Sequence, residues 1–229
     1  MSSIRFELYK PVGQQQSESD GCSPPWLHEI RTLRSNILYA SGRRPSFGPL
    51  GHRFGDPCPH DHRSFHITAR VGKKIVGCIR GRPLSSRSND ALLDDVMGQA
   101  KLDHSLAALQ VNRHNCLEVS RLTVDAEFRA SQIARQMVAS IWALSWHVGL
   151  KMIVAGVGTR DYQDRFIARL GLRPMPHSEP MLAHAYNDHV RPMYAWTHAP
   201  ANSIAAMVRE MHDHFFGNEQ RAPMLATAV

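Results

Sequence analysis

Hydrophobic and polar residues alternate along several short segments of this chain, and each such segment predicts a β-strand with one buried face. The clearest runs from Leu117 to Val124, where charged and hydroxyl residues separate the apolar ones. The segment 152–155 is apolar throughout, as in a strand that is buried on both faces. Further strands are predicted over residues 4–9, 65–70, 74–80 and 190–196.

Apolar residues spaced three and four apart predict amphipathic helices between these strands. Ser23 is expected to cap the first helix, which begins with two prolines, and Thr159 and Asn202 are expected to cap two later ones. Tyr162 is expected to face inward from the helix that follows Thr159. The predicted helices cover residues 24–38, 90–109 (as one helix or two), 131–148, 160–170 and 203–215.

This order of elements predicts an α+β fold with a mixed central sheet over residues 1–200, and a C-terminal helix and tail over 201–229 that pack on this domain or extend from it. The 229 residues are 43% hydrophobic and 21% charged, as in a globular protein with a substantial core. The net charge of +7 favours an acidic partner or serves solubility alone. The basic residues are scattered, without the block of Lys and Arg and the stacking aromatics of a nucleic-acid surface, so no nucleic-acid partner is expected.

The four cysteines show no C-x-x-C spacing, and the first ten residues contain no apolar signal segment. These features favour free thiols and a cytoplasmic location. The longest apolar stretch, 137–158, is interrupted by His147, Gly149 and Lys151 and indicates a helix followed by a strand. No membrane-spanning segment is therefore expected.

The strand that ends at Val124 leads through a basic loop into a helix that begins near Ser131. Free backbone N–H groups and the helix dipole converge at such a helix start, which makes it a natural site for a phosphate group. Arg129 and Arg135 flank this turn.

The motif E-V-S-R-L-T-V at 118–124 resembles the E-x-S-R strand of acyl-homoserine lactone synthases and of N-acyl amino acid synthases, a branch of the GNAT acyltransferase superfamily. The segment R-A-S-Q-I-A at 129–134 is similar to the superfamily's R/Q-x-x-G-x-G/A phosphate loop, with Gln132 and Ala134 in place of its glycines. Further resemblances follow in superfamily order and together cover about residues 4–196. They are L-R-S-N-I-L at 33–38, D-H-R-S-F-H at 61–66, G-C-I-R at 77–80 and F-I-A-R-L-G-L-R at 166–173.

The resemblance implies a GNAT fold, with a V-shaped cleft between two splayed central strands. It also implies a long-chain acyl group delivered as a thioester of acyl carrier protein, with acyl-phosphopantetheine as the donor and no permanently bound cofactor. The residues expected to hold the phosphopantetheine are Arg129, Gln132, Ile133, Ala134 and Arg135.

Acyl transfer to an amine requires a neutral amine, a polarised carbonyl and an anchored donor. No serine or cysteine lies in a nucleophile-elbow sequence, so direct attack by the amine is favoured. Glu118 is the candidate base, and Ser120 and Arg121 complete the catalytic set; alternatively, Glu118 only pairs with Arg80 or Arg121. Arg80 and Arg121 can bind the carboxylate of the acceptor, or they hold the strands together through Glu118 or Asp61.

The resemblance places Asp56 and Asp61 near the acceptor amine, with Arg34 and His66 as further substrate-binding residues; capping of a loop is the alternative for the two aspartates. The spacing C-x-H-x-H-x-x-x-H at 58–66 contains zinc-ligand types but matches no closed structural site, so no metal is expected.

Three functions remain open. The first is an N-acyl amino acid synthase that uses acyl carrier protein and an amino acid. The second is an acyl-homoserine lactone synthase, although residues 41–60 contain no tryptophan where that family's pattern requires one. The third is an inactive carrier-binding module. Two features favour it: the phosphate loop lacks its glycines, and residue 167 is an isoleucine where many GNAT enzymes carry a tyrosine that acts as an acid.

Overall fold

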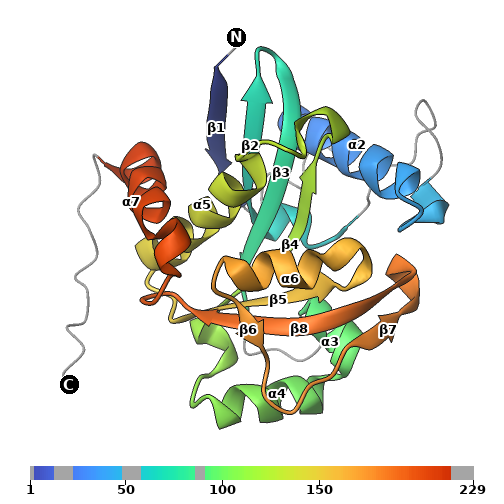
Figure 1. Ribbon diagram of the computed structural model, residues 1–229, viewed down its shortest axis with the longest axis vertical. Helices are drawn as coiled ribbons and strands as arrows, with labels where there is room; N and C mark the ends of the chain where they lie inside the picture. Colours follow the sequence, from blue (N-terminus) through green and yellow to red (C-terminus); the bar gives the residue numbers. More distant parts are fainter. Residues whose placement is uncertain (1–2, 13–22, 48–57, 86–90, 218–229) are drawn as a thin grey trace.

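The computed structural model describes residues 3–12, 23–47, 58–85 and 91–217. Eight strands form one sheet in the order β1-β2-β3-β4-β5-β8-β6, and β7 pairs with β8 (Figure 1). All neighbouring strands are antiparallel except the central pair, β4 and β5, which is parallel. The strands are β1 Ile4–Tyr9, β2 Phe65–Val71, β3 Lys74–Pro83, β4 Cys116–Val124, β5 Met152–Gly158, β6 Arg173–Pro174, β7 Met181–Ala183 and β8 Asp188–Trp196.

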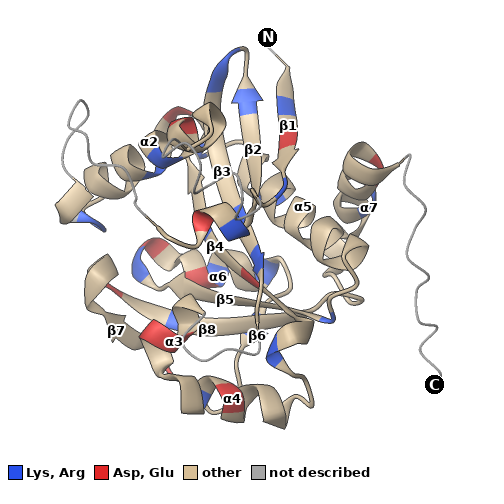
Figure 2. Ribbon diagram, turned by 180° about the vertical axis from the view of Figure 1, so that it is seen from behind, with Lys and Arg blue, Asp and Glu red and all other residues tan. Residues whose placement is uncertain are grey.

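Helices cover both faces of the sheet, so the GNAT-type α+β layering expected from the sequence is confirmed. Helices α5 and α6 lie in front of the sheet in Figure 1, and α2 and α3 lie against its reverse face, which Figure 2 shows. The α-helices are α2 Pro25–Ala40, α3 Leu92–Met97, α4 Gln99–Ala108, α5 Ile133–His147, α6 Gln163–Arg169 and α7 Asn202–Phe216. Short 3-10 turns are η1 Pro45–Phe47, η2 Asp61–Arg63, η3 Arg113–Asn115, η4 Ala126–Phe128, η5 Arg160–Tyr162 and η6 His184–Tyr186.

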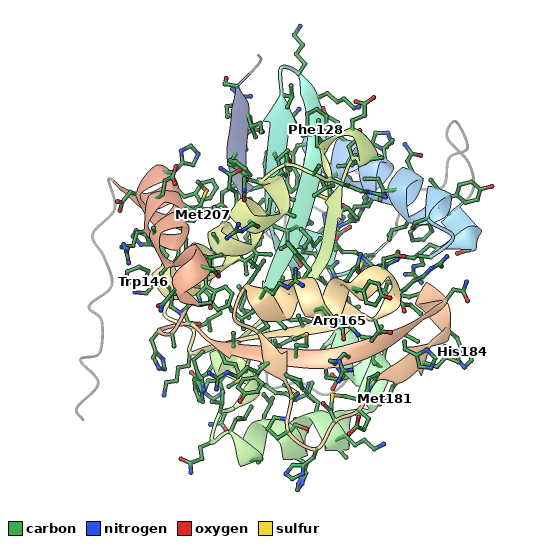
Figure 3. All side chains as sticks on the ribbon, in the orientation of Figure 1. Phe128, Trp146, Arg165, Met181, His184 and Met207 are labelled. Atoms are coloured by element: carbon green, nitrogen blue, oxygen red, sulfur yellow. The ribbon has the colours of Figure 1, made fainter. Side chains whose placement is uncertain are left out.

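The main core lies between the sheet and α5, whose side chains Met137 and Trp142 are fully buried there. Gly77 permits this close packing, because a Cβ at this position would lie only 3.0 Å from the end of Met137. Helix α7 packs on α5 and buries Met211 and Phe216 in the same core. Met207 of α7 and Trp146 of α5, which Figure 3 labels, are partly buried against this core. The C-terminal helix is thus part of the domain.

The two central strands separate halfway along their length. Strand β4 pairs with β5 only from Cys116 to Val119; beyond that point β4 follows β3 to Val124, whereas β5 follows β8 to Gly158. Between the pairs Cys78↔Thr123 and Arg80↔Ser120, β3 has one residue and β4 has two. This β-bulge increases the local twist and turns β4 away from β5. The splayed pair predicted from the sequence is confirmed.

Several predicted helix starts differ in detail. Pro24, not Ser23, occupies the N-cap of α2, and the Ser23 hydroxyl accepts a hydrogen bond from Arg31 instead. Neither Thr159 nor Asn202 caps a helix with its side chain. Tyr162 is 66% exposed, because it adopts a left-handed conformation at the N-cap of α6 and so cannot turn inward.

No described helix is both long and apolar enough to cross a membrane.

Candidate active site

Glu118 lies at the root of the split between β4 and β5, on the face of the sheet that carries α2 and α3. Its carboxylate accepts hydrogen bonds from Arg82 Nη2 at 3.0 Å and from the backbone N–H of Leu93 at 3.0 Å, and it is only 2% exposed. Burial raises the pKa of the Glu118 carboxyl above its ordinary value, and this effect outweighs the opposing charge of Arg82.

A second buried carboxylate, Asp61, lies under α2 on the same face. Arg34 binds it through two nitrogens, at 3.1 and 2.7 Å, while Arg80 Nη1 donates to it at 2.8 Å and Arg31 Nε at 3.0 Å. Asp61 and Arg34 are fully buried. Burial raises the pKa of Asp61, but the guanidinium groups of Arg34 and Arg80 outweigh it and hold that pKa well below its usual range.

Ser120 and His66 extend the network around Asp61. Arg80 Nε donates to Ser120 Oγ at 3.1 Å, which connects β3 to β4. His66 Nε2 lies 2.9 Å from the backbone carbonyl of Asp61, an acceptor that requires the proton on Nε2. Burial lowers the pKa of His66 to about 4 despite the nearby Asp61, so its ring stays neutral near pH 7.

Five of the residues predicted to be functional thus meet in one network: Arg34, Asp61, His66, Arg80 and Ser120. Arg80 does form the expected ion pair with Asp61, whereas Glu118 forms its ion pair with Arg82 and not with Arg80 or Arg121. The reason is register: Arg82 lies directly opposite Glu118, and Arg80 lies opposite Ser120.

Arg82 was missed from the sequence, although side chains two apart on a strand share a face, so Arg80 already pointed to it. Its Nη1 also donates to His60 Nδ1 at 3.1 Å, and Arg80 Nη1 donates to Cys58 Sγ at 2.9 Å. Among the described residues, no group of three or more Cys, His, Asp or Glu side chains is arranged to hold a metal ion. Asp56 lies outside the described residues.

Arg121 occupies the bulge of β4, just beyond the last pair with β5, with a φ of 60°. Such a left-handed conformation is uncommon and strained for a residue other than glycine. The side chain donates from Nη1 to the hydroxyl of Tyr186, in the turn between β7 and β8, and so spans the open end of the split. Sequence reasoning missed Tyr186, since no local pattern indicates this contact.

The predicted phosphate loop leads from β4 into α5, close to Phe128 (Figure 3). Gln132 is the N-cap of α5, and the N–H of Ile133 donates to Ser131 Oγ at 3.3 Å. The next N–H groups, including that of Ala134, have no acceptor within the helix and can bind an anion. Arg129 is exposed beside this loop.

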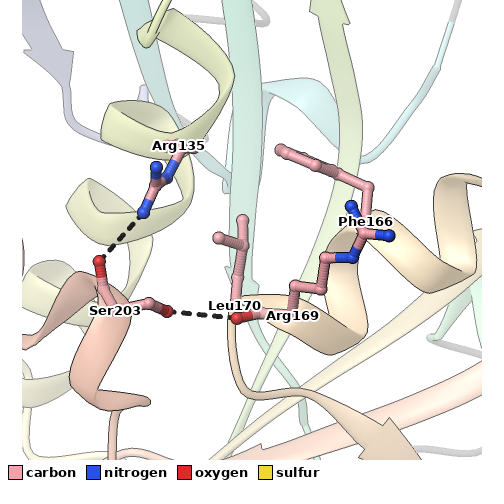
Figure 4. A pocket seen from close by; sticks show the side chains of 5 residues that line it. All are labelled: Arg135, Phe166, Arg169, Leu170 and Ser203. Carbon is pink, nitrogen blue, oxygen red and sulfur yellow. Dashed lines mark hydrogen bonds between the residues drawn. The ribbon is translucent and has the colours of Figure 1, made fainter.

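Arg135 lies in the first turn of α5 and is directed at α7, where its Nη2 donates to the carbonyl of Ser203 at 3.0 Å (Figure 4). It borders a hollow of about 230 Å³ between α5, α6 and α7. Arg129 and Arg135 therefore do not converge on one point, although both lie near the start of α5. The lining residues are Arg135, Phe166, Arg169, Leu170 and Ser203.

No protein-family profile and no curated protein matches this sequence. Among solved structures, the CoA-dependent acyl-homoserine lactone synthase BjaI, with SAM and isopentyl-CoA, is 17% identical with a TM-score of 0.60 and covers 96% of this chain and 93% of its own. The CoA-dependent acyl-homoserine lactone synthase MesI is 15% identical, with a TM-score of 0.58, and the match covers 98% of this chain and 100% of MesI. FeeM, an N-acyl amino acid synthase from uncultured soil microbes, is 12% identical, with a TM-score of 0.54, and the match covers 85% of this chain and 92% of FeeM. At these identities the likeness concerns the fold, and this chain has the GNAT-like fold that its motifs suggested.

Proposed function

We propose that this protein is an N-acyltransferase that moves a long-chain acyl group from the thioester of acyl carrier protein to the α-amine of an amino acid. The observation that carries the proposal is the split between β4 and β5. The start of α5, whose free N–H groups can bind a phosphate, lies at one side of it, and the buried residues Glu118 and Asp61 lie on the opposite face of the sheet. A thioester inserted through the split would meet an amine approaching from that face.

Glu118 suits the role of general base. A base must be deprotonated at the working pH and yet basic enough to accept a proton, and burial moves the pKa of this carboxyl upward, toward neutrality. Because its oxygens already accept from Arg82 and Leu93, the proton would reach it through a water molecule. Direct aminolysis then forms the C–N bond and releases the thiol of phosphopantetheine.

The donor follows from the loop before α5. Side chains at Gln132 and Ala134 restrict how closely a pyrophosphate can approach, whereas the single phosphodiester of phosphopantetheine needs less room. CoA remains a competing donor, since BjaI and MesI are CoA-dependent synthases.

The second candidate is an acyl-homoserine lactone synthase, because the structural overlap with BjaI exceeds that with FeeM. The two functions differ in their acceptor and product. An N-acyl amino acid keeps its carboxylate, whereas a lactone synthase closes a ring on S-adenosylmethionine.

The decisive experiment combines two donors, acyl carrier protein and CoA loaded with the same acyl chain, with the twenty amino acids and S-adenosylmethionine. Free thiol and the mass of the product are measured. We expect an N-acyl amino acid, formed faster from acyl carrier protein. Lactone formation would favour the second candidate, and binding of acyl carrier protein without release of thiol would indicate an inactive carrier-binding module.

The donor site is tested in the same assay with Arg129→Glu, since Arg129 lies exposed beside the loop. We expect a higher KM for acyl carrier protein, an effect that added salt should mimic in the unchanged protein. Equal or better activity with acyl-CoA would contradict specificity for the carrier protein.

A further inference from the structure

Arg44, just beyond the C-terminus of α2, is held by two aromatic rings. Its Cζ lies 4.3 Å from the ring centroid of Tyr186 and 5.0 Å from that of Phe47. Its Nη1 donates to the carbonyl of Ala185 at 2.7 Å. A guanidinium that lies over two rings is fixed in orientation and can form further hydrogen bonds only near its own plane.

The charge of Arg44 has no carboxylate within salt-bridge distance in the part of the chain that the structure describes. Its neighbour differs: Arg43 lies within 3.7 Å of Asp188, and it donates to Gln163 at 2.6 Å. The Nε of Arg44 is buried and has no hydrogen-bond partner among the described residues. A buried donor without an acceptor costs free energy, so the geometry of Arg44 is not explained by hydrogen bonds within the described residues alone.

This guanidinium lies beside the open end of the β4–β5 split. The ring that Arg44 covers belongs to Tyr186, whose hydroxyl accepts from Arg121 at the bulge of β4. The Cζ of Arg121 is itself 5.4 Å from the Tyr186 centroid. The turn that carries Tyr186 begins at His184, which Figure 3 labels.

We propose that Arg44 binds the α-carboxylate of the amino acid acceptor, with Tyr186 as the residue that positions it; the inference rests on the proposed function. Arg80, the residue expected to bind this carboxylate, is 1% exposed and already paired with Asp61. Arg44 supplies a fixed charge beside the open end of the same split, without a carboxylate partner among the described residues.

The test compares each amino acid of the panel with its α-carboxamide, which has the same side chain but no charge. Arg44→Gln is expected to reduce the preference for the acid about 10- to 100-fold, the range of a charge-assisted hydrogen bond. The loss should appear as a higher KM for the amino acid, with the KM for the acyl donor unchanged. Arg165→Gln is the matched control, since Arg165 also lies over a tyrosine, the exposed Tyr162, at 4.7 Å (Figure 3).

Two variants of Tyr186 separate positioning from folding. Tyr186→Phe keeps the ring under Arg44 and is expected to keep the preference for the acid, whereas Tyr186→Leu removes the ring and should weaken it although Arg44 is still present. If Arg44→Gln slows the acid and the amide equally, or leaves the preference intact, the inference is wrong. If the unchanged protein acylates none of these amines, the proposed function itself fails.

Discussion

Two buried carboxylates, Asp61 and Glu118, lie on the same face of the sheet, yet their surroundings move their pKa values in opposite directions. Burial raises the pKa of both. Asp61 is surrounded by Arg31, Arg34 and Arg80, so positive charge prevails and the pKa falls. Glu118 has one direct guanidinium partner, Arg82, and for it burial prevails.

The difference assigns different tasks to the two groups. A carboxyl with a strongly lowered pKa stays ionised and accepts protons poorly, which suits the anchor of a charge network. A carboxyl with a raised pKa accepts a proton more readily, which suits a base. Asp61 therefore organises α2 and β3, and Glu118 is the better candidate for proton transfer.

The largest expected effect is on stability at Asp61. Asp61→Asn removes the anion that neutralises three arginines, and breaking a buried ion pair from one side costs about 3–5 kcal/mol. We expect a loss of this order in the free energy of unfolding, measured by urea denaturation. Asp125→Asn is a suitable control, because Asp125 pairs with the exposed Lys74 and should lose far less. Equal stability of the two variants would refute the structural role of Asp61.

Glu118→Gln tests whether Glu118 takes part in proton transfer. We expect a loss of about 10²-fold or more in kcat, the usual scale for a general base. The structure adds a complication, because the new amide group must face either Arg82 or the N–H of Leu93, so some stability is lost as well. The free energy of unfolding must therefore be measured together with kcat.

Arg82→Gln separates these two effects. It breaks the same ion pair but keeps the carboxylate, so a base at Glu118 should remain active. Removal of the guanidinium raises the pKa of Glu118 further, and the acidic limb of the pH–rate profile should move to higher pH. If Glu118→Gln keeps near-normal turnover, or if both variants lose activity equally, Glu118 has a structural role only.

The sequence was sufficient for what depends on local periodicity. Strand β4 and helix α5 follow from the spacing of their apolar residues, and the pairing of Asp61 with Arg80 was one of the alternatives that the sequence left open. The rest depends on register and on distant contacts. The bulge at Arg121 moves side chains of β4 from one face of the sheet to the other, and no sequence signal marks it. Arg121 therefore contacts Tyr186, which lies 65 residues later in the chain.

Two arginines near a strand carboxylate would by themselves lower its pKa, yet the pKa of Glu118 is raised, because the carboxyl is buried. The depth of burial cannot be read from the positions of charged residues along the strands. Arg80 pairs with Asp61, whereas Arg82 is the guanidinium that binds Glu118 directly, and Arg80 acts on Glu118 only through its charge. The strand register determines which charged side chains pair with each other, and this register is known only from the folded sheet.

The smallest expected effect concerns His66, whose pKa is lowered from its ordinary value of 6.5 to about 4 by burial. Between these two values the unfolded chain binds a proton that the folded protein does not. The stability that depends on a neutral His66 is therefore complete above pH 6.5. It is lost as the pH falls toward 4, at about 1.4 kcal/mol per pH unit. We expect His66→Gln, which keeps an N–H donor for the carbonyl of Asp61, to remove about 2 kcal/mol of the loss between pH 6.5 and pH 5.

Urea denaturation of both proteins across this range measures the difference, and parallel curves would contradict it. The fall in the free energy of unfolding between pH 6.5 and pH 5 cannot come from Asp61. Because the pKa of Asp61 is lowered, the stability that it contributes is lost only below about pH 3.8, the ordinary pKa of an aspartate. Glu118 acts with the opposite sign: its raised pKa contributes stability at low pH that is lost as pH rises above its ordinary value of 4.5. His66→Gln should therefore flatten the fall in stability toward acid, and Glu118→Gln should steepen it.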